Sequence, residues 1–168
     1  MDEASAVPHF HMSFDGSLLA RGFWIYVWNV RDANQSHVYV GRTGDSSSPN
    51  ASSPFHRIGQ HLDIRLTAKA NSLTKLLQGK QMEPSACHFE MVGIGPLHDE
   101  VSNMDEHRPL RDRVGAIEKA VAGMLRDRNY SVLGVHHARE TPDENVMRKI
   151  RPIIEQHFPP QLDPRADV

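Results

Sequence analysis

Five residues of this chain carry side chains that could together hydrolyse a phosphodiester bond. Tyr26 and Tyr39 each lie in an aromatic and β-branched run, with twelve residues between them. Arg57 and His61 are four residues apart, which places them on one flank of a helix. Glu118 lies more than fifty residues later, at the edge of an apolar helical stripe. Phosphodiester hydrolysis needs an activated water, a cation on the phosphoryl oxygens, a metal and help for the leaving group.

Each of these needs has a candidate among the five side chains. Arg57 could clamp phosphate oxygens through its planar guanidinium. Glu118 could hold Mg²⁺, which often takes only one or two protein carboxylates and keeps several waters. A tyrosine or a histidine could move the proton. The alternative is ordinary for each residue alone: strand tyrosines usually pack, and helical Glu, Arg and His side chains usually face solvent. Their combination in this order favours a site.

Three strands are predicted from the hydrophobic pattern. Residues 23–30 are apolar on both faces, with odd and even positions alternating, which is typical of a central strand. A polar turn at residues 31–36 leads to a second strand at 38–40, and the short connection makes the pair antiparallel. Residues 87–94, which end at a Gly-Pro pair, predict the third strand.

The helix that carries Arg57 and His61 is predicted to begin at Ser53, with Pro54 in the first helical position. A loop of Ser, Pro and Asn at residues 45–53 precedes it. Its apolar residues recur at helical spacing and are expected to face the core: Phe55, Ile58, Leu62 and Leu66.

Further helices are predicted after this one. Residues 73–77 indicate a short helix, and residues 110–126 give the clearest helical stripe, which includes Glu118 at its edge. A last helix is expected to begin as a capping box at residues 141–144, and Pro152 is expected to kink it or end it early. Between these helices, residues 133–137 are expected to form a short extended piece.

Taken in order, these residues resemble the GIY-YIG nuclease family. The resemblance rests on Trp24-Ile25-Tyr26, Tyr39-Val40-Gly41, the Arg57/His61 step, Glu118 and Asn129. It covers about residues 22–130. Two positions depart from the family pattern, since Trp24 stands where the first motif has glycine and Val40 where the second has isoleucine.

The resemblance implies a fold and an activity. The fold would be α+β, with a small three-stranded antiparallel sheet flanked by helices and, in this chain, an extra C-terminal helix. The chain would divide into an N-terminal extension at 1–20, a nuclease domain at 21–137, and a C-terminal helix and tail at 138–168 packed on the same domain. The activity would be that of a DNA endonuclease using one Mg²⁺ or Mn²⁺ ion.

The resemblance also implies a role for each of the five catalytic candidates. Tyr26 would activate or position the attacking water, and Tyr39 would contact the water or the phosphate. Arg57 would stabilise the charge of the pentacovalent phosphate. His61 would assist proton transfer or hold Tyr26, and Glu118 would bind the metal.

Three residues would complete the substrate-binding side of the site. Gly41 would allow close approach of the backbone at the end of its strand. Arg42, directly after the second motif, would meet DNA, and Asn129 would support the site as a nearby polar residue. No zinc-finger or helix-turn-helix pattern is visible, so a homodimer or a partner protein would have to supply specificity.

Composition limits the other function classes. The chain has 168 residues and a formal net charge of −2, so any DNA-binding surface must be a local basic patch. It has one cysteine, Cys87, an acidic and polar N-terminus, and no apolar run long enough to span a bilayer. We therefore expect a soluble cytoplasmic protein, and the alternative to an enzyme is a non-catalytic binding module of the same fold.

Overall fold

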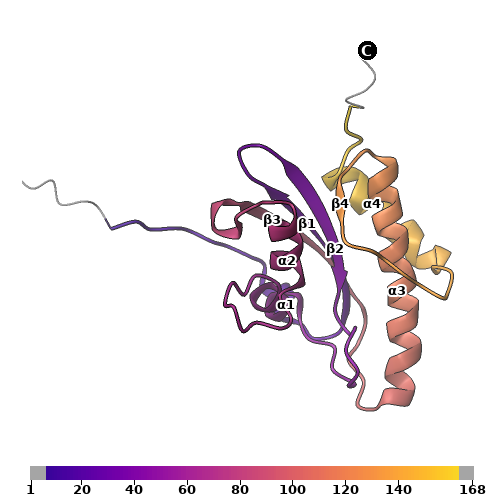
Figure 1. Ribbon diagram of the computed structural model, residues 1–168. Coiled ribbons are helices and arrows are strands. Elements are labelled where there is room, and N and C mark those ends of the chain that lie inside the picture. Colours follow the sequence, from indigo (N-terminus) through magenta and orange to yellow (C-terminus); the bar gives the residue numbers. More distant parts are fainter. Residues whose placement is uncertain (1–6, 163–168) are drawn as a thin grey trace, which may run out of the picture.

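A four-stranded sheet forms the middle layer of the computed structural model, which describes residues 7–162. The strands are β1 (Phe23–Arg31), β2 (Ser36–Arg42), β3 (His88–His98) and β4 (Val132–Leu133), in the order β3-β1-β2-β4. The helices are α1 (Pro54–His61), α2 (Ser72–Gly79), α3 (Met104–Asp127) and α4 (Glu144–His157), with 3-10 turns at η1 (Gly16–Leu19) and η2 (Pro84–Ala86). Figure 1 shows α1 and α2 on one side of the sheet and α3 and α4 on the other.

β1 is buried on both faces because its neighbours β2 and β3 flank it and helices cover both sides of the sheet. Its odd-numbered apolar residues, such as Ile25, pack with α3 and α4, and its even-numbered ones, such as Trp28, pack with α2. This alternation matches the prediction from the sequence. Because the two cores share one strand, a side chain on either face of β1 is held by tight packing.

The sheet has one strand more than predicted, so the three-stranded, wholly antiparallel sheet is corrected to a four-stranded mixed one. β4 pairs in parallel with β2 through two residue pairs, Val38 with Val132 and Tyr39 with Leu133. Two residues are too few to give a periodic signal in a sequence. Gly134 then turns the chain away with a φ of +80°, so within residues 7–162 the last residues of β2 have no strand on that side.

The first helix begins as predicted but is shorter. Ser53 Oγ accepts a hydrogen bond from the His56 backbone, which confirms the N-cap. The helix ends at His61, whose carbonyl accepts a hydrogen bond from the Thr74 side chain of α2 (3.0 Å). Leu66 therefore lies in the following loop and is fully exposed, which corrects its predicted place in the core.

The last helix begins and ends differently from the prediction. Asp143, and not Thr141, is the N-cap, because its carboxylate accepts from the backbone N–H groups of Asn145 and Val146. Pro152 neither ends the helix nor shortens it, since α4 continues to His157 with its apolar face in the core. Within residues 7–162, no helix combines the length and the apolar character needed to cross a membrane.

The neighbouring strand makes room for the large side chain of Trp24. The register of β1 against β3 shifts between Phe23 and Ile25, where Trp24 lies. Gly95 of β3 packs against its ring, and a Cβ there would come within 3.0 Å of the indole. The indole N–H donates to the Ala20 carbonyl (3.1 Å). The third strand accordingly runs past Gly95 and Pro96 to His98, beyond its predicted end.

Candidate active site

Tyr26 and His61 form a hydrogen-bonded pair inside the layer between the sheet and α1. The Tyr26 hydroxyl and His61 Nε2 are 2.6 Å apart, and both residues are only 1% exposed. The same hydroxyl lies 3.2 Å from the Arg42 carbonyl, to which it can donate. A tyrosine has one hydroxyl proton, so it donates to only one of these two acceptors at a time.

Burial determines the charge state of this pair. Burial, with the Arg57 charge adding to it, lowers the pKa of His61 to about 4, so the imidazole is neutral at pH 7. Burial also raises the pKa of Tyr26, so its phenol stays protonated. His61 Nδ1 is buried without a hydrogen-bond partner. The pair can therefore pass a proton but holds no charge at rest.

Gly41 is directly opposite Tyr26 in the β1–β2 ladder, and its role is steric. A Cβ at this position would lie 2.5 Å from Cε2 of the Tyr26 ring. Only glycine leaves the ring in this place, so the second motif supports the first. The close approach expected at Gly41 is therefore that of the Tyr26 ring across the strand.

Arg57 is fixed from two sides. Its Nη2 donates to Asp45 Oδ2 (3.0 Å) and its Nη1 donates to Gln60 Oε1 (2.9 Å). The side chain is largely buried, and Nε has no partner. Its charge acts on the pKa values of Tyr26 and His61, which places the guanidinium beside that pair.

Tyr39 lies between the buried pair and the outer part of the site. Its ring meets the His61 ring edge-on, with centroids 5.3 Å apart. Burial, followed by the nearby Glu118 charge, raises its pKa to about 12. The phenol is therefore neutral at pH 7 and lies within the electrostatic reach of the carboxylate.

Glu118 faces the site from α3, on the opposite side of the sheet. Burial raises the pKa of this carboxyl to about 7, although Arg42 and Arg57 favour its charged form. Arg42 Nε lies 3.5 Å from Glu118 Oε2 and makes no hydrogen bond, so the two form a charge contact only. Glu118 is thus a largely buried carboxylate without full compensation.

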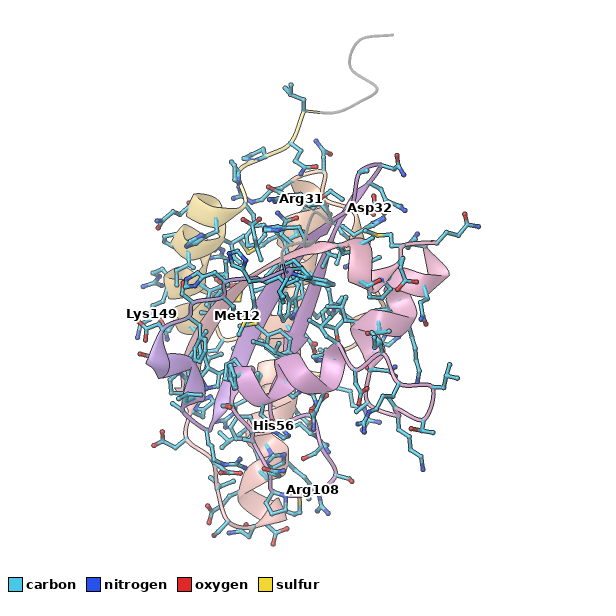
Figure 2. The ribbon with its side chains drawn as sticks, turned by 90° about the vertical axis from the view of Figure 1, so that its left-hand side faces the viewer. Met12, Arg31, Asp32, His56, Arg108 and Lys149 are labelled. Carbon is cyan, nitrogen blue, oxygen red and sulfur yellow. The ribbon has the colours of Figure 1, made fainter. Side chains whose placement is uncertain are left out.

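The groups from the two layers meet around the free edge of β2, past the end of β4. Two hollows of about 430 and 410 Å³ open there. The charged residues that line the first are Arg42, Asp45, Arg111, Asp112 and Arg139. Those that line the second are Lys75 and Glu118, together with Tyr39 and His136. Figure 2 faces the α1 and α2 layer, with Arg31 and Asp32 marking one end of the sheet and His56 and Arg108 the other.

Asn129 is not brought to this site. It follows the end of α3 with a φ of +66°, and its amide donates to the Gln161 carbonyl (3.0 Å). It is eleven residues beyond Glu118, which along a helix corresponds to about 16 Å. Asn129 therefore ties the C-terminal segment to α3, which corrects its predicted place among the substrate-binding residues.

The sequence pattern missed two residues of the site. Asp45 directly follows the glycine-flanked end of β2 and holds Arg57, but it looked like an ordinary loop residue. His136 covers the free edge of β2, since its Nε2 donates to the Val40 carbonyl (3.1 Å) and its Nδ1 accepts from Arg126 (3.3 Å). For Asp45, the sequence signal that could have indicated its role was its position directly after Gly44.

The donor set fits a hard divalent cation that keeps most of its water. Within residues 7–162, no group of three or more His, Cys, Asp or Glu side chains converges as a metal cage. Glu118 instead offers one carboxylate, which lines the second hollow, and the charge of Asp45 lies nearby. Mg²⁺ and Mn²⁺ sites that also use substrate phosphates need only one or two such carboxylates.

No protein-family model, curated protein or solved structure matches this chain. The resemblance to GIY-YIG nucleases therefore remains a hypothesis, and a function has to be argued from the geometry of the site.

Proposed function

We propose that this protein is a divalent-metal-dependent DNA endonuclease of the GIY-YIG type, which hydrolyses phosphodiester bonds. The observation that carries the proposal is that Tyr26 on β1 and Glu118 on α3 both lie within the electrostatic reach of Arg57 on α1. A residue that only packs gains nothing from being a buried, poorly compensated carboxylate. Perturbed titratable groups beside a hollow are typical of functional sites.

Arg57 is suited to hold the phosphate. Asp45 and Gln60 fix two of its nitrogens, so the guanidinium is positioned before a substrate arrives. A fixed cation in a partly dry site stabilises charge on phosphoryl oxygens more strongly than it would in water. Tyr39 lies on the same side and can donate its hydroxyl proton to a phosphate oxygen or to water.

Tyr26 and His61 are suited to move the proton of the attacking water. The phenol is too weakly acidic to ionise in its buried position, so a free phenolate is not needed as the base. The water proton can pass to the Tyr26 oxygen while Tyr26 passes its own proton to His61 Nε2, 2.6 Å away. His61 is neutral above about pH 4 because burial lowers its pKa, so it can accept that proton.

Glu118 is the residue we propose for the metal, which would be Mg²⁺ or Mn²⁺. When bound, the ion supplies neutralising charge at the phosphoryl and leaving oxygens. The protein contributes the carboxylate, the adjoining hollow and the charge of Asp45 close by. Removing the metal with a chelator should therefore abolish cleavage.

DNA is the proposed substrate because the first hollow has a small excess of positive charge. Its lining has three arginines, Arg42, Arg111 and Arg139, against two aspartates, Asp45 and Asp112, so a backbone phosphate can be bound there although the whole chain has a net charge of −2. One chain has one such site. A double-strand break would then need two copies or two successive nicks, and a partner protein could supply sequence specificity.

The second candidate function is a non-catalytic binding module of the same fold. The observation in its favour is that Arg42 lies against Glu118, where the metal would have to bind. In that case Glu118 would serve only as the counter-charge of an arginine that contacts nucleic acid or protein.

Cleavage assays distinguish the two functions. Supercoiled plasmid and a panel of single-stranded and branched DNA are incubated with Mg²⁺ or Mn²⁺ and the wild type, Glu118→Gln or Glu155→Gln. Glu155 is an exposed glutamate of α4, so Glu155→Gln is a charge-matched control. We expect nicking by the wild type and Glu155→Gln, and a loss of at least about 100-fold for Glu118→Gln. Absence of cleavage on every substrate would contradict the nuclease and favour the non-catalytic binding module.

A further inference from the structure

Arg42 occupies a position that is built for its guanidinium. The side chain lines the first hollow, reaches across to α3, and its Nη1 donates to the Arg111 carbonyl (3.2 Å). Its Nε points to Glu118 Oε2 at 3.5 Å. Arg42 thus joins the two hollows, because Glu118 lines the second one.

Gly115 is what lets the guanidinium lie there. A Cβ at Gly115 would be 1.8 Å from Nη1 and 3.0 Å from Cζ of Arg42, a contact that no side chain tolerates. Gly115 lies one turn before Glu118 on α3, so the helix surface next to the carboxylate is bare at this point. The place of Arg42 therefore depends on a single residue that carries no charge.

The contact between Arg42 and Glu118 is weak for a pair with so little exposure. Both side chains are less than a fifth exposed, at 19% and 17%, yet Nε has no hydrogen-bond partner and no bidentate pair forms. Good compensation of a buried ion pair requires close, hydrogen-bonded geometry. A doubly charged ion with oxygen preference can displace such a partner.

We propose that Arg42 is the resident counter-cation of Glu118 in the metal-free protein, and that a divalent metal displaces it. The released guanidinium then lies in the first hollow with Arg111 and Arg139, where it can bind a backbone phosphate. Metal and phosphate would each favour binding of the other, because both favour the same position of Arg42. This inference rests on the proposed function, in which Glu118 is the metal ligand.

Mn²⁺ titration of the protein alone, followed by electron paramagnetic resonance of the free ion, tests the displacement. Arg42→Gln removes the competitor, and we expect the affinity for Mn²⁺ to rise about tenfold, which corresponds to about 1.4 kcal/mol. Gly115→Ala keeps every charge and only pushes the guanidinium away, and we expect it to raise the affinity in the same direction by a smaller factor. Glu118→Gln should remove the site.

Lys119→Gln is the matched control for charge. Lys119 is the exposed neighbour of Glu118 on α3, so its removal changes the net charge by the same amount without touching the contact. The inference is overturned if Lys119→Gln and Arg42→Gln raise the affinity equally, if Gly115→Ala leaves it unchanged, or if no variant binds Mn²⁺. None of these outcomes involves DNA, so the plasmid assay judges the nuclease separately.

DNA binding gives a second readout of the same displacement. Fluorescence anisotropy of a short labelled duplex is measured with and without Mn²⁺ in a Tyr26→Phe background, which suppresses cleavage. We expect Mn²⁺ to strengthen binding several-fold more with Arg42 present than in Arg42→Gln. An equal gain in both proteins would show that the released guanidinium does not meet the phosphate.

Discussion

The two halves of the candidate site are built in opposite ways. Tyr26 and His61 are enclosed at 1% exposure and joined by a contact of 2.6 Å. Arg42 and Glu118 lie at the free edge of β2, line hollows, and are joined only by a charge contact of 3.5 Å. The first pair is neutral and complete before any ligand binds, while the second is charged and incomplete.

In the proposed function, the two halves have different tasks. An enclosed, hydrogen-bonded pair keeps one geometry, which is what proton transfer requires. A poorly compensated ion pair changes partners easily, which is what binding of a metal and a phosphate requires.

Tyr26→Phe should cause the largest change in activity. It removes the hydroxyl that connects the reacting water to His61, so we expect cleavage to fall by about 10²–10⁴-fold. The stability should fall by only about 1 kcal/mol, since one buried hydrogen bond is lost. Tyr39→Phe, measured in the same plasmid assay and by thermal unfolding, should cause a smaller loss of cleavage. A reversed order of the two variants would contradict the proton relay.

The two halves should respond to pH with opposite signs. The pKa of Glu118 is raised from 4.5 to about 7, so its ionisation costs stability above pH 7 and the cost disappears as pH falls toward 4.5. The pKa of His61 is lowered from 6.5 to about 4, so its stability is complete above pH 6.5 and is lost as pH falls toward 4. Each full shift corresponds to on the order of 3 kcal/mol.

Urea unfolding between pH 4.5 and 8 measures this opposition. Glu118→Gln should be more stable than the wild type at pH 8, with the difference vanishing near pH 4.5. The free energy of unfolding of His61→Gln should rise relative to that of the wild type as pH falls. The charged groups that act on Glu118 are Arg42, Asp45 and Arg57, and the one that acts on His61 is Arg57. Neither substitution changes any of these residues. Parallel trends in the two variants would contradict the contrast between the halves.

Substitution of two glycines should change the stability of the protein by different amounts, because each glycine contacts a different half of the candidate site. A Cβ at Gly41 meets the Tyr26 ring, which is buried and fixed, so Gly41→Ala should cost about 1–3 kcal/mol and most of the activity. A Cβ at Gly115 meets the guanidinium of Arg42, which is the far end of a long side chain that lines the first hollow. Gly115→Ala should therefore unfold close to the wild-type temperature in differential scanning calorimetry. Equal losses would show that Arg42 is held as rigidly as Tyr26.

Asn129→Gly should have the smallest effect. Glycine accepts the φ of +66° without strain, so only the hydrogen bond to Gln161 is lost. We expect the stability to change by less than about 1 kcal/mol and plasmid nicking to stay at the wild-type rate. A clear loss of nicking would return Asn129 to the site.

The elements that have a strong local signal could be predicted from the sequence. The alternating apolar residues of β1 and the Ser53-Pro54 start of α1 are local features, and both are found in the structure. The order of Tyr26, Tyr39, Arg57, His61 and Glu118 predicted a single site. In the structure His61 contacts both tyrosines, through a hydrogen bond to Tyr26 and a ring contact with Tyr39.

The remaining features depend on contacts between distant parts of the chain. β4 exists only because two residues pair with β2, and the hydrophobic stripe of α1 stops early because Thr74 caps the His61 carbonyl. The role of Asp45 appears only once α1 has folded against the loop. These contacts cannot be predicted from the spacing or the composition of the chain. The Arg42–Glu118 contact is another example.

The shortness of β4 has a consequence for association between molecules. An unpaired strand edge usually invites pairing with another chain, and proteins cover or blunt such edges. Here the edge beyond β4 is covered at Val40 by the imidazole of His136, and no further strand of the described part of the chain pairs with it. Extending β4 would remove the hazard but would also close the way to Glu118 and Tyr39. Resistance to aggregation and access to the candidate site are therefore set by the same few residues, and neither can be improved there without a cost to the other.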